Sequence, residues 1–207
     1  MIIALTGKPS SGKSSFFKAS TMIDVKTSPV PFTTITPNSG IGYVTITCIC
    51  KELNTQCKPK HGHCKNGKRF VPVKLVDVGG LIPGSHLGRG IGNQFLDDIR
   101  QASVLIQIVD ASGLTDEEGK PTENFNPEKE IEFLEDEINL WFEDVIKRNL
   151  EKIKLPSSEA DLINLLHEKL SGLEVTKQQL SDTLEKTSIS DIKSFAKVLR
   201  ELSKPIL

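Results

Sequence analysis

The chain has 207 residues, of which 37% are hydrophobic and 26% charged, and its formal net charge is −1. These values are typical of one large globular domain, or one domain with an insertion, and they exclude tight nucleic-acid binding driven by overall charge. No run of about 18 apolar residues is present, which argues against a membrane span. We expect a cytoplasmic protein whose four cysteines are reduced.

The start of the chain carries a phosphate-binding motif in its usual setting. Residues 1–6 are an apolar run that predicts a buried strand, and residues 7–14 read GKPSSGKS, a full match to G-x-x-x-x-G-K-[ST]. Residues 14–20 continue without Gly or Pro, as a helix start would. In such a loop the backbone N–H groups face phosphate oxygens, the lysine adds positive charge and the next hydroxyl can bind Mg²⁺. The predicted phosphate-binding residues are Gly7, Lys8, Pro9, Ser10, Ser11, Gly12, Lys13, Ser14 and Ser15, together with the more distant Gly80.

The segments that follow alternate between loops and apolar or β-branched runs, which is typical of an α/β protein. In chain order we expect a loop over 27–40, a strand over 40–50, a long hairpin connection over 51–69, a strand over 70–77, a glycine-rich loop over 79–92, a helix over 93–102 and a buried strand over 104–110.

From about residue 121 the pattern becomes helical. Asn126 is a suitable N-cap with Pro127 in the first turn, and apolar residues recur at helical spacing up to Leu150. Further helices are expected over 158–170, 176–186 and 191–202, the last capped by Ser190. We interpret their apolar stripes as faces that pack on one another, with a partner-binding coiled coil as the alternative.

The expected fold is therefore α/β, a P-loop NTPase with a mostly parallel sheet, helices on both faces and one antiparallel strand. A nucleotide-binding domain would span residues 1–120 and resume at about 203–207. An α-helical insertion would span residues 121–202.

Two further motifs narrow the class of P-loop protein. Residues 77–80 read DVGG, a D-x-x-G at a strand end, where Asp77 can hold Mg²⁺ through water and the Gly80 N–H can meet a γ-phosphate. Residues 31–37 read PFTTITP, and a threonine there can close onto Mg²⁺ and the γ-phosphate. We favour Thr34 over Thr33, because the Thr-Ile step resembles other switch GTPases. The predicted Mg²⁺ ligands are Ser14, Thr34 and Asp77.

Three stretches, residues 7–14, 31–38 (PFTTITPN) and 77–96 (DVGGLIPGSHLGRGIGNQFL), resemble the YchF-type branch of the Obg-related GTPases, in the TRAFAC class. The resemblance implies a switch that hydrolyses GTP or ATP with Mg²⁺, often in contact with the ribosome or RNA. Relatives carry Asn at the position of Ser10, where it helps to hold K⁺; the shorter serine argues against K⁺ stimulation here.

Leu81 stands where Ras-like switches carry a water-orienting Gln, so we expect a slow intrinsic rate. The candidate catalytic residues are Lys13, Thr34, His86 and Arg89.

Family members continue into a base-reading N-[KM]-x-[DE] motif and a TGS domain, whereas residues 204–207 resemble only the opening of the preceding strand. We therefore expect a fragment, in which the choice between GTP and ATP stays open.

Two other functions remain as alternatives. One is a nucleotide-gated ribosome- or RNA-binding module with negligible turnover. The other is a P-loop kinase for a small molecule, although Ser10 stands where such kinases carry Gly.

Four cysteines, at positions 48, 50, 57 and 64, lie with two histidines within 17 residues and could hold zinc. The spacing lacks C-x2-C pairs, and Cys48 would share a strand face with Cys50, where cysteine is often simply a buried apolar residue. If zinc binds, the expected ligands are Cys50, Cys57, Cys64 and His61.

The same hairpin is also basic. Between Lys51 and Lys74 there are seven Lys or Arg against one acid, so this hairpin could contact RNA or be a solvated surface.

Overall fold

The computed structural model describes residues 1–23, 38–88, 92–151, 153, 156 and 158–207. Two residues of the expected site, Thr34 and Arg89, lie outside these ranges, as does Thr33. Within them, no helix is both long enough and apolar enough to cross a membrane.

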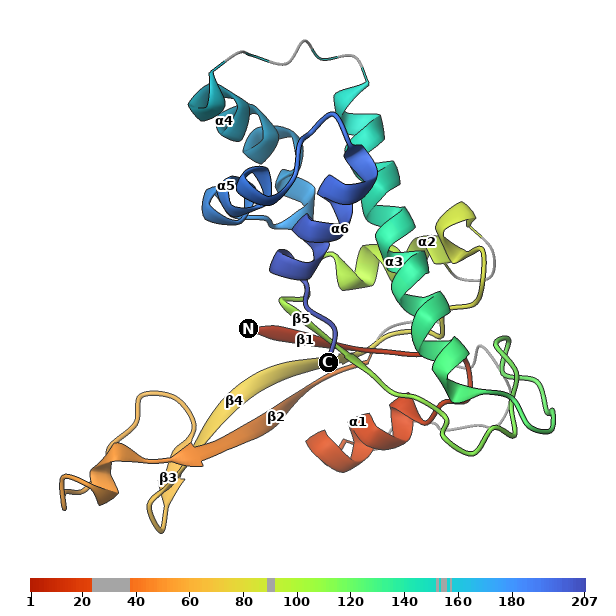
Figure 1. Cartoon of the computed structure of the whole chain (residues 1–207). Coiled ribbons are helices and arrows are strands. Elements are labelled where there is room, and N and C mark those ends of the chain that lie inside the picture. The colour runs from red at the N-terminus through yellow and green to blue at the C-terminus, as the bar shows by residue number, and fades with distance from the viewer. Residues whose placement is uncertain (24–37, 89–91, 152, 154–155, 157) are drawn as a thin grey trace.

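The centre of the molecule is a β-sheet with the strand order β2-β4-β1-β5 (Figure 1). Strands β4 (Lys68–Asp77), β1 (Ile2–Thr6) and β5 (Val104–Gln107) are parallel, and β2 (Asn38–Thr47) runs antiparallel to β4. The short β3 (His63–Lys65) also pairs antiparallel with β4. The last residues of the chain return to this sheet, where Ile206 forms a parallel bridge with Leu105 of β5.

Helices cover both faces of the sheet because residues along β1 alternate between them. Ile3 and Leu5 pack with Phe17 of α1 (Lys13–Thr21) on one face. Ala4 faces the opposite side and belongs to a core that includes Phe95 of α2 (Gly92–Ile99) and Leu134 of α3 (Pro127–Leu150). The predicted fold class, a mostly parallel sheet with helices on both faces, is confirmed.

Beyond the sheet lie three more helices, α4 (Glu159–Lys169), α5 (Lys177–Lys186) and α6 (Ile192–Ser203) (Figure 1). Helix α3 packs on α6, α6 on α5 and α5 on α4, and all four contribute to one core. These helices begin and end within two residues of the sequence prediction. Asn126 caps α3 by accepting a hydrogen bond from the Glu128 N–H, as predicted. The prediction for α6 was wrong: its N-cap is Asp191, whose carboxylate accepts from the Ser194 N–H, while Ser190 bonds to Ser188. The apolar stripes face one another, which favours packing over an exposed coiled coil.

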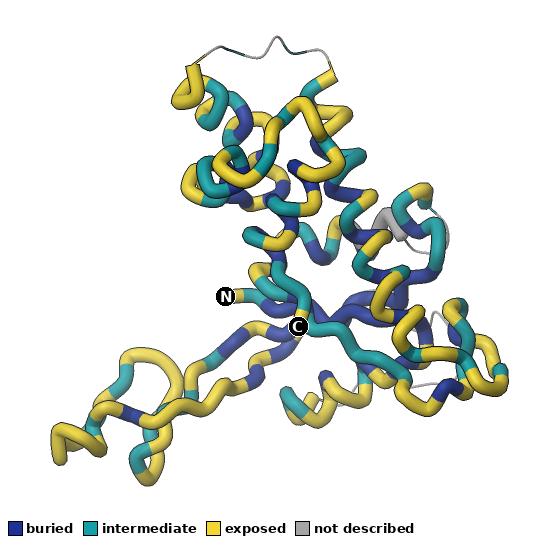
Figure 2. The backbone as a smooth tube through the Cα atoms, viewed as in Figure 1, coloured by how far each residue is buried: buried dark blue, intermediate teal, exposed yellow. Residues whose placement is uncertain are grey.

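Strands β2 and β4 continue past the sheet into a projecting hairpin, residues 43–72, which we call the arm (Figure 1). Most of its residues are exposed (Figure 2). Strand β2 ends at Thr47 rather than at the predicted residue 50, because the Cys48 N–H donates to the Gly67 carbonyl and the chain turns into the 3₁₀ helix η1 (Ile49–Lys51). The sequence prediction also missed β3, which is only three residues long.

Candidate functional site

The phosphate-binding motif forms a loop between β1 and α1, as predicted. Gly7 has φ of 146°, and a Cβ atom there would lie 2.4 Å from the Ile108 carbonyl oxygen, so only glycine suits this turn. Gly12 and Ser10 also have positive φ, at 98° and 63°. The loop therefore has the compact backbone that allows its N–H groups to face an anion.

Lys13 lies folded over this loop. Its Nζ donates a 2.6 Å hydrogen bond to the Lys8 carbonyl oxygen, and its side chain is 7% exposed. Burial lowers the pKa of Lys13 to about 8, against the opposing effect of the Asp77 and Glu130 charges. A cation that is desolvated in this way gains from a nearby anion such as a phosphate.

Ser14 and Asp77 are 63 residues apart in the chain and meet beside the loop. The Ser14 Oγ donates a 2.6 Å hydrogen bond to Oδ2 of Asp77, which is fully buried. The other carboxylate oxygen, Oδ1, has no hydrogen-bond partner among the described residues, and neither has the buried Ser11 hydroxyl. Burial raises the pKa of Asp77, while the Ser14 hydrogen bond and the Lys13 charge lower it. The two predicted Mg²⁺ ligands that the structure describes are thus brought together.

The D-x-x-G segment packs directly on the phosphate loop. A Cβ atom on Gly80 would lie 2.5 Å from the Pro9 nitrogen, and the Leu81 N–H donates to the Gly7 carbonyl oxygen at 3.1 Å. Gly80 therefore packs against the phosphate loop, and its contact with a γ-phosphate stays a prediction.

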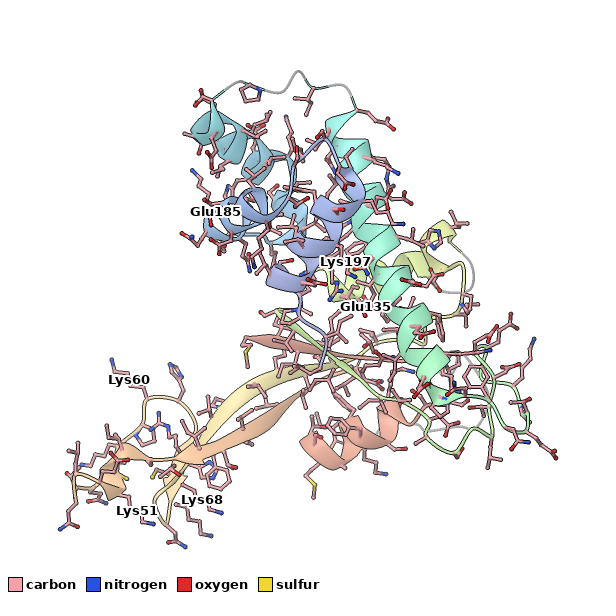
Figure 3. All side chains as sticks on the ribbon, viewed as in Figure 1. Lys51, Lys60, Lys68, Glu135, Glu185 and Lys197 are labelled. Atoms are coloured by element: carbon pink, nitrogen blue, oxygen red, sulfur yellow. The ribbon has the colours of Figure 1, made fainter. Side chains whose placement is uncertain are left out.

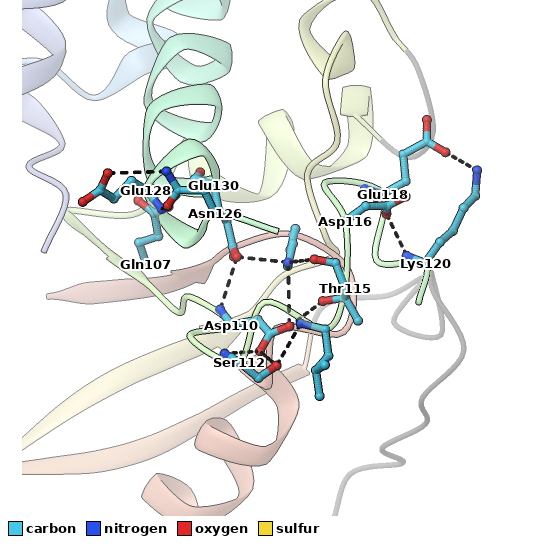
Figure 4. A network of polar contacts seen from close by, with 12 residues as sticks. Gln107, Asp110, Ser112, Thr115, Asp116, Glu118, Lys120, Asn126, Glu128 and Glu130 are labelled. Atoms are coloured by element: carbon cyan, nitrogen blue, oxygen red, sulfur yellow. Dashed lines mark hydrogen bonds and ion pairs between the residues drawn. The ribbon is translucent and has the colours of Figure 1, made fainter. Parts of the chain in front are cut away.

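The Lys8 side chain has a role that the sequence did not indicate. It is fully buried, and its Nζ donates to the Thr115 carbonyl oxygen at 2.7 Å and lies 3.3 Å from Glu130 and 3.8 Å from Asp110. The three partners, Asp110, Thr115 and Glu130, are labelled in Figure 4. Only the backbone of Lys8 is left for phosphate binding. The side chain instead ties the loop to residue 130 at the start of α3.

A second residue of α3, Glu137, holds the loop that follows Gly80. Its carboxylate accepts hydrogen bonds from the Gly84 N–H at 2.6 Å and from the His86 N–H at 2.8 Å. The His86 ring, a predicted catalytic candidate, is 2.7 Å from the same carboxylate through Nδ1. The structure thus places His86 against α3. No sequence signal pointed to Glu137, because one glutamate in an acidic helix is not distinctive.

The four cysteines converge at the tip of the arm. Their sulfur atoms all lie within 4.8 Å of one another. His61 does not belong to this group; its carbonyl oxygen accepts a hydrogen bond from Arg69, and Cys48 supplies the fourth sulfur instead. The sequence had placed Cys48 and Cys50 on one face of a strand, but the turn after Thr47 lets both reach the cluster.

A family model described as "50S ribosome-binding GTPase" matches residues 2–140. The chain is 42% identical to an uncharacterized GTP-binding protein of Methanocaldococcus jannaschii, over 100% of this chain and 54% of that protein. It is 32% identical to the GTPase Obg of Caldanaerobacter subterraneus, over 89% of this chain and 39% of the relative.

Among solved structures, a GTP-binding protein from Pyrococcus horikoshii OT3 aligns with a TM-score of 0.72 and 33% identity, over 100% of this chain and 55% of that one. The chain spans about half the length of the curated relatives it matches first. These similarities are all to GTP-binding proteins, and they give no support to the ATP-binding or kinase alternatives.

Proposed function

The chain belongs to the 50S ribosome-binding GTPase family, and from that premise we propose that it is a molecular switch that binds GTP with Mg²⁺ and hydrolyses it. One observation carries the proposal beyond family membership. Beside a loop built for phosphate, Ser14 meets a buried Asp77 that keeps one oxygen atom without a partner among the described residues.

This arrangement fits a Mg²⁺ ion. A hard cation takes oxygen ligands and usually keeps several waters, and the Ser14 hydroxyl and the Asp77 carboxylate offer such oxygens side by side. Ser14 would bind the ion directly and Asp77 through water, and we retain Thr34 as a further ligand. When bound, Mg²⁺ neutralises charge on the β- and γ-phosphates.

The remaining steps fall to the chain itself. Lys13 and the loop N–H groups would hold the phosphates. The charged Lys13 Nζ would give up its hydrogen bond to the Lys8 carbonyl oxygen and form a stronger hydrogen bond with a phosphate oxygen, because both groups are then charged. The Gly80 N–H would donate a hydrogen bond to the γ-phosphate. The attacking water would be oriented by a group other than Leu81, with His86 and Arg89 as candidates, so we expect slow turnover without a partner.

We further propose that the protein is of the YchF type, on the basis of the PFTTITPN and DVGGLIPGSH segments. The ribosome link is supported by the charge of the arm, where six Lys or Arg between positions 51 and 69 face one acid. Figure 3 shows Lys51, Lys60 and Lys68 around its far end. The His63 ring also stacks on Phe70 at 4.3 Å. Basic and aromatic side chains together are typical of RNA-binding surfaces.

The nucleotide site is tested by competition for a fluorescent GDP by unlabelled GTP, GDP, ATP and ADP with Mg²⁺. We expect guanine nucleotides to compete, and Lys13→Ala or Ser14→Ala to weaken binding by about 10- to 100-fold, as expected for loss of one charge-assisted contact. Lys18→Ala, on the exposed side of the same helix, is the control. Unchanged affinity in both site variants would refute the site.

The arm is tested separately, by sedimentation of the chain with purified large ribosomal subunits at increasing salt. Replacing Lys51, Lys60 and Lys68 by Glu should weaken binding and reduce its salt dependence, because fewer counterions are released. GTP hydrolysis without subunits should be unchanged. If subunits bind but turnover is negligible with GTP, the nucleotide-gated binding module becomes the better description.

A further inference from the structure

The sulfur atoms at the tip of the arm have the arrangement of a metal cage. Cys48 Sγ lies 3.6 Å from Cys57 Sγ, and Cys50 Sγ lies 3.6 Å from Cys64 Sγ. All the other pairs are within 4.8 Å. Four sulfurs that bind one Zn²⁺ at about 2.3 Å stand about 3.8 Å from one another at the corners of a tetrahedron. The observed separations therefore leave room for one such ion at the centre.

Hydrogen-bonded backbone positions three of the four cysteines. Cys48 follows the last residue of β2, and its N–H donates to the Gly67 carbonyl across the hairpin at 2.8 Å. Cys50 lies within η1, and its carbonyl oxygen accepts from the Thr55 N–H. Cys64 lies in β3, opposite Arg69 of β4. Three sulfurs thus come from hydrogen-bonded elements, and Cys57 comes from the connecting loop.

The tip has almost no hydrophobic core to explain this convergence. Between Tyr43 and Pro72, all of which the structure describes, Cys48 is the only buried residue. Large apolar side chains at the tip are exposed, including Ile49 at 64% and Leu53 at 66%. Segments that bury so little apolar surface need a disulfide or a metal to hold one conformation. We propose that this cluster binds one structural Zn²⁺ through four cysteine thiolates.

The surroundings are suited to the charge of such a site. A site of four thiolates and one Zn²⁺ has a net charge of −2. The arm that surrounds it is strongly basic, and its positive charges would stabilise this negative site. The Arg69 guanidinium donates a 3.4 Å hydrogen bond to Cys57 Sγ, so a positive charge lies beside the proposed ligands. The same side chain bonds the His61 carbonyl, so it also holds the loop that carries Cys57. Groups that hydrogen-bond metal ligands in this way orient them and tune the site.

A bound zinc explains this cluster better than disulfide bonds or a bound iron would. Disulfide formation would join the sulfurs in pairs and bring each pair to about 2.05 Å, leaving no reason for all four to converge on one point. A single iron also accepts four sulfurs, but zinc is redox-inert and forms the usual closed structural site. Binding would release the thiol protons to solvent and leave the cysteines reduced, which agrees with their free state in the structure.

The test is metal analysis of the whole chain, purified without a polyhistidine tag or chelator and then desalted. We expect about one zinc per chain, as for a closed four-cysteine site. Cys48→Ser and Cys57→Ser should lower the zinc content to well below one. His61→Ala should leave it unchanged, and this matched variant separates the four-cysteine site from one that uses a histidine. Circular dichroism of each variant shows whether the rest of the chain stays folded.

A second measurement decides the question even if a cysteine variant fails to fold. Chelation of the wild-type metal should make the arm more sensitive to trypsin at Lys60, in the exposed loop that follows Cys57, and added Zn²⁺ should restore protection. Three results would overturn the proposal: fully reduced cysteines without zinc, stoichiometric iron in place of zinc, or disulfides between the cysteine pairs. Each is read directly from metal content and thiol counting.

Discussion

Glu137 offers the sharpest test of how α3 is joined to the loop after Gly80. Its side chain is 8% exposed, and it accepts two backbone N–H groups together with the His86 ring. Glu137→Gln keeps the size and shape of the side chain but replaces one accepting oxygen by an NH₂ group, which cannot accept. Either the Gly84 or the His86 N–H must then lose its partner.

The expected cost follows from the contacts. A hydrogen bond to a charged group contributes about 1.5–3 kcal/mol, and the bond that remains is weakened because its acceptor is now neutral. We therefore expect Glu137→Gln to lower the free energy of unfolding by about 2–4 kcal/mol. For a chain of this size, the melting temperature should fall by roughly 5–12 °C.

The measurement is chemical and thermal denaturation at pH 7, followed by circular dichroism and tryptophan fluorescence. Trp141 lies one turn along α3 from Glu137 and reports on this region. Glu132→Gln is the control, because it removes the same charge from an exposed position of the same helix and should change stability by less than about 0.5 kcal/mol. If the two variants unfold alike, the carboxylate does not hold the loop and the reasoning fails.

Three further predictions concern the phosphate loop. Lys8→Met should destabilise the chain by about 3 kcal/mol, because it leaves the buried carboxylate of Glu130 without its cation, whereas the exposed Lys129→Met should be nearly neutral in the same denaturation assay. Gly80→Ala should cost about 1–3 kcal/mol through the clash with Pro9, while Gly172→Ala, with no atom within 4 Å of the new Cβ, should cost little; equal melting temperatures would contradict this. The pKa of Lys13 is about 8 in the free protein, and a bound phosphate should keep it protonated. Nucleotide binding at pH 8 should then take up about half a proton, measured by calorimetry in buffers of different ionisation heat, and affinity should fall as the pH rises above 8. Absence of proton uptake at pH 8 would show that Lys13 is not the titrating group.

The parts of the fold that the sequence predicted well depend on local signals. The helices of the second half follow apolar spacing and the Asn126-Pro127 start, both of which act within a few residues. An element boundary differs from the prediction where a distant partner decides it. Strand β2 ends at Thr47 because Gly67, on the other side of the hairpin, accepts a hydrogen bond there. The N-cap of α6 differs for a local reason: Asp191 accepts from the Ser194 N–H, while the adjacent Ser190 bonds to Ser188.

The sequence by itself indicated the phosphate loop and assigned Ser14 and Asp77 to one site, since each belongs to a motif with characteristic residue types and spacing; the structure shows that their side chains meet. It left open where the individual side chains point. Lys8 turns toward Glu130, Glu137 reaches across to Gly84, and Cys48 takes the place expected for His61. Each of these contacts joins segments that are distant in the chain and form no recurring pattern. Only the tertiary structure, which packs α3 against the sheet and folds the arm back on itself, brings their atoms together.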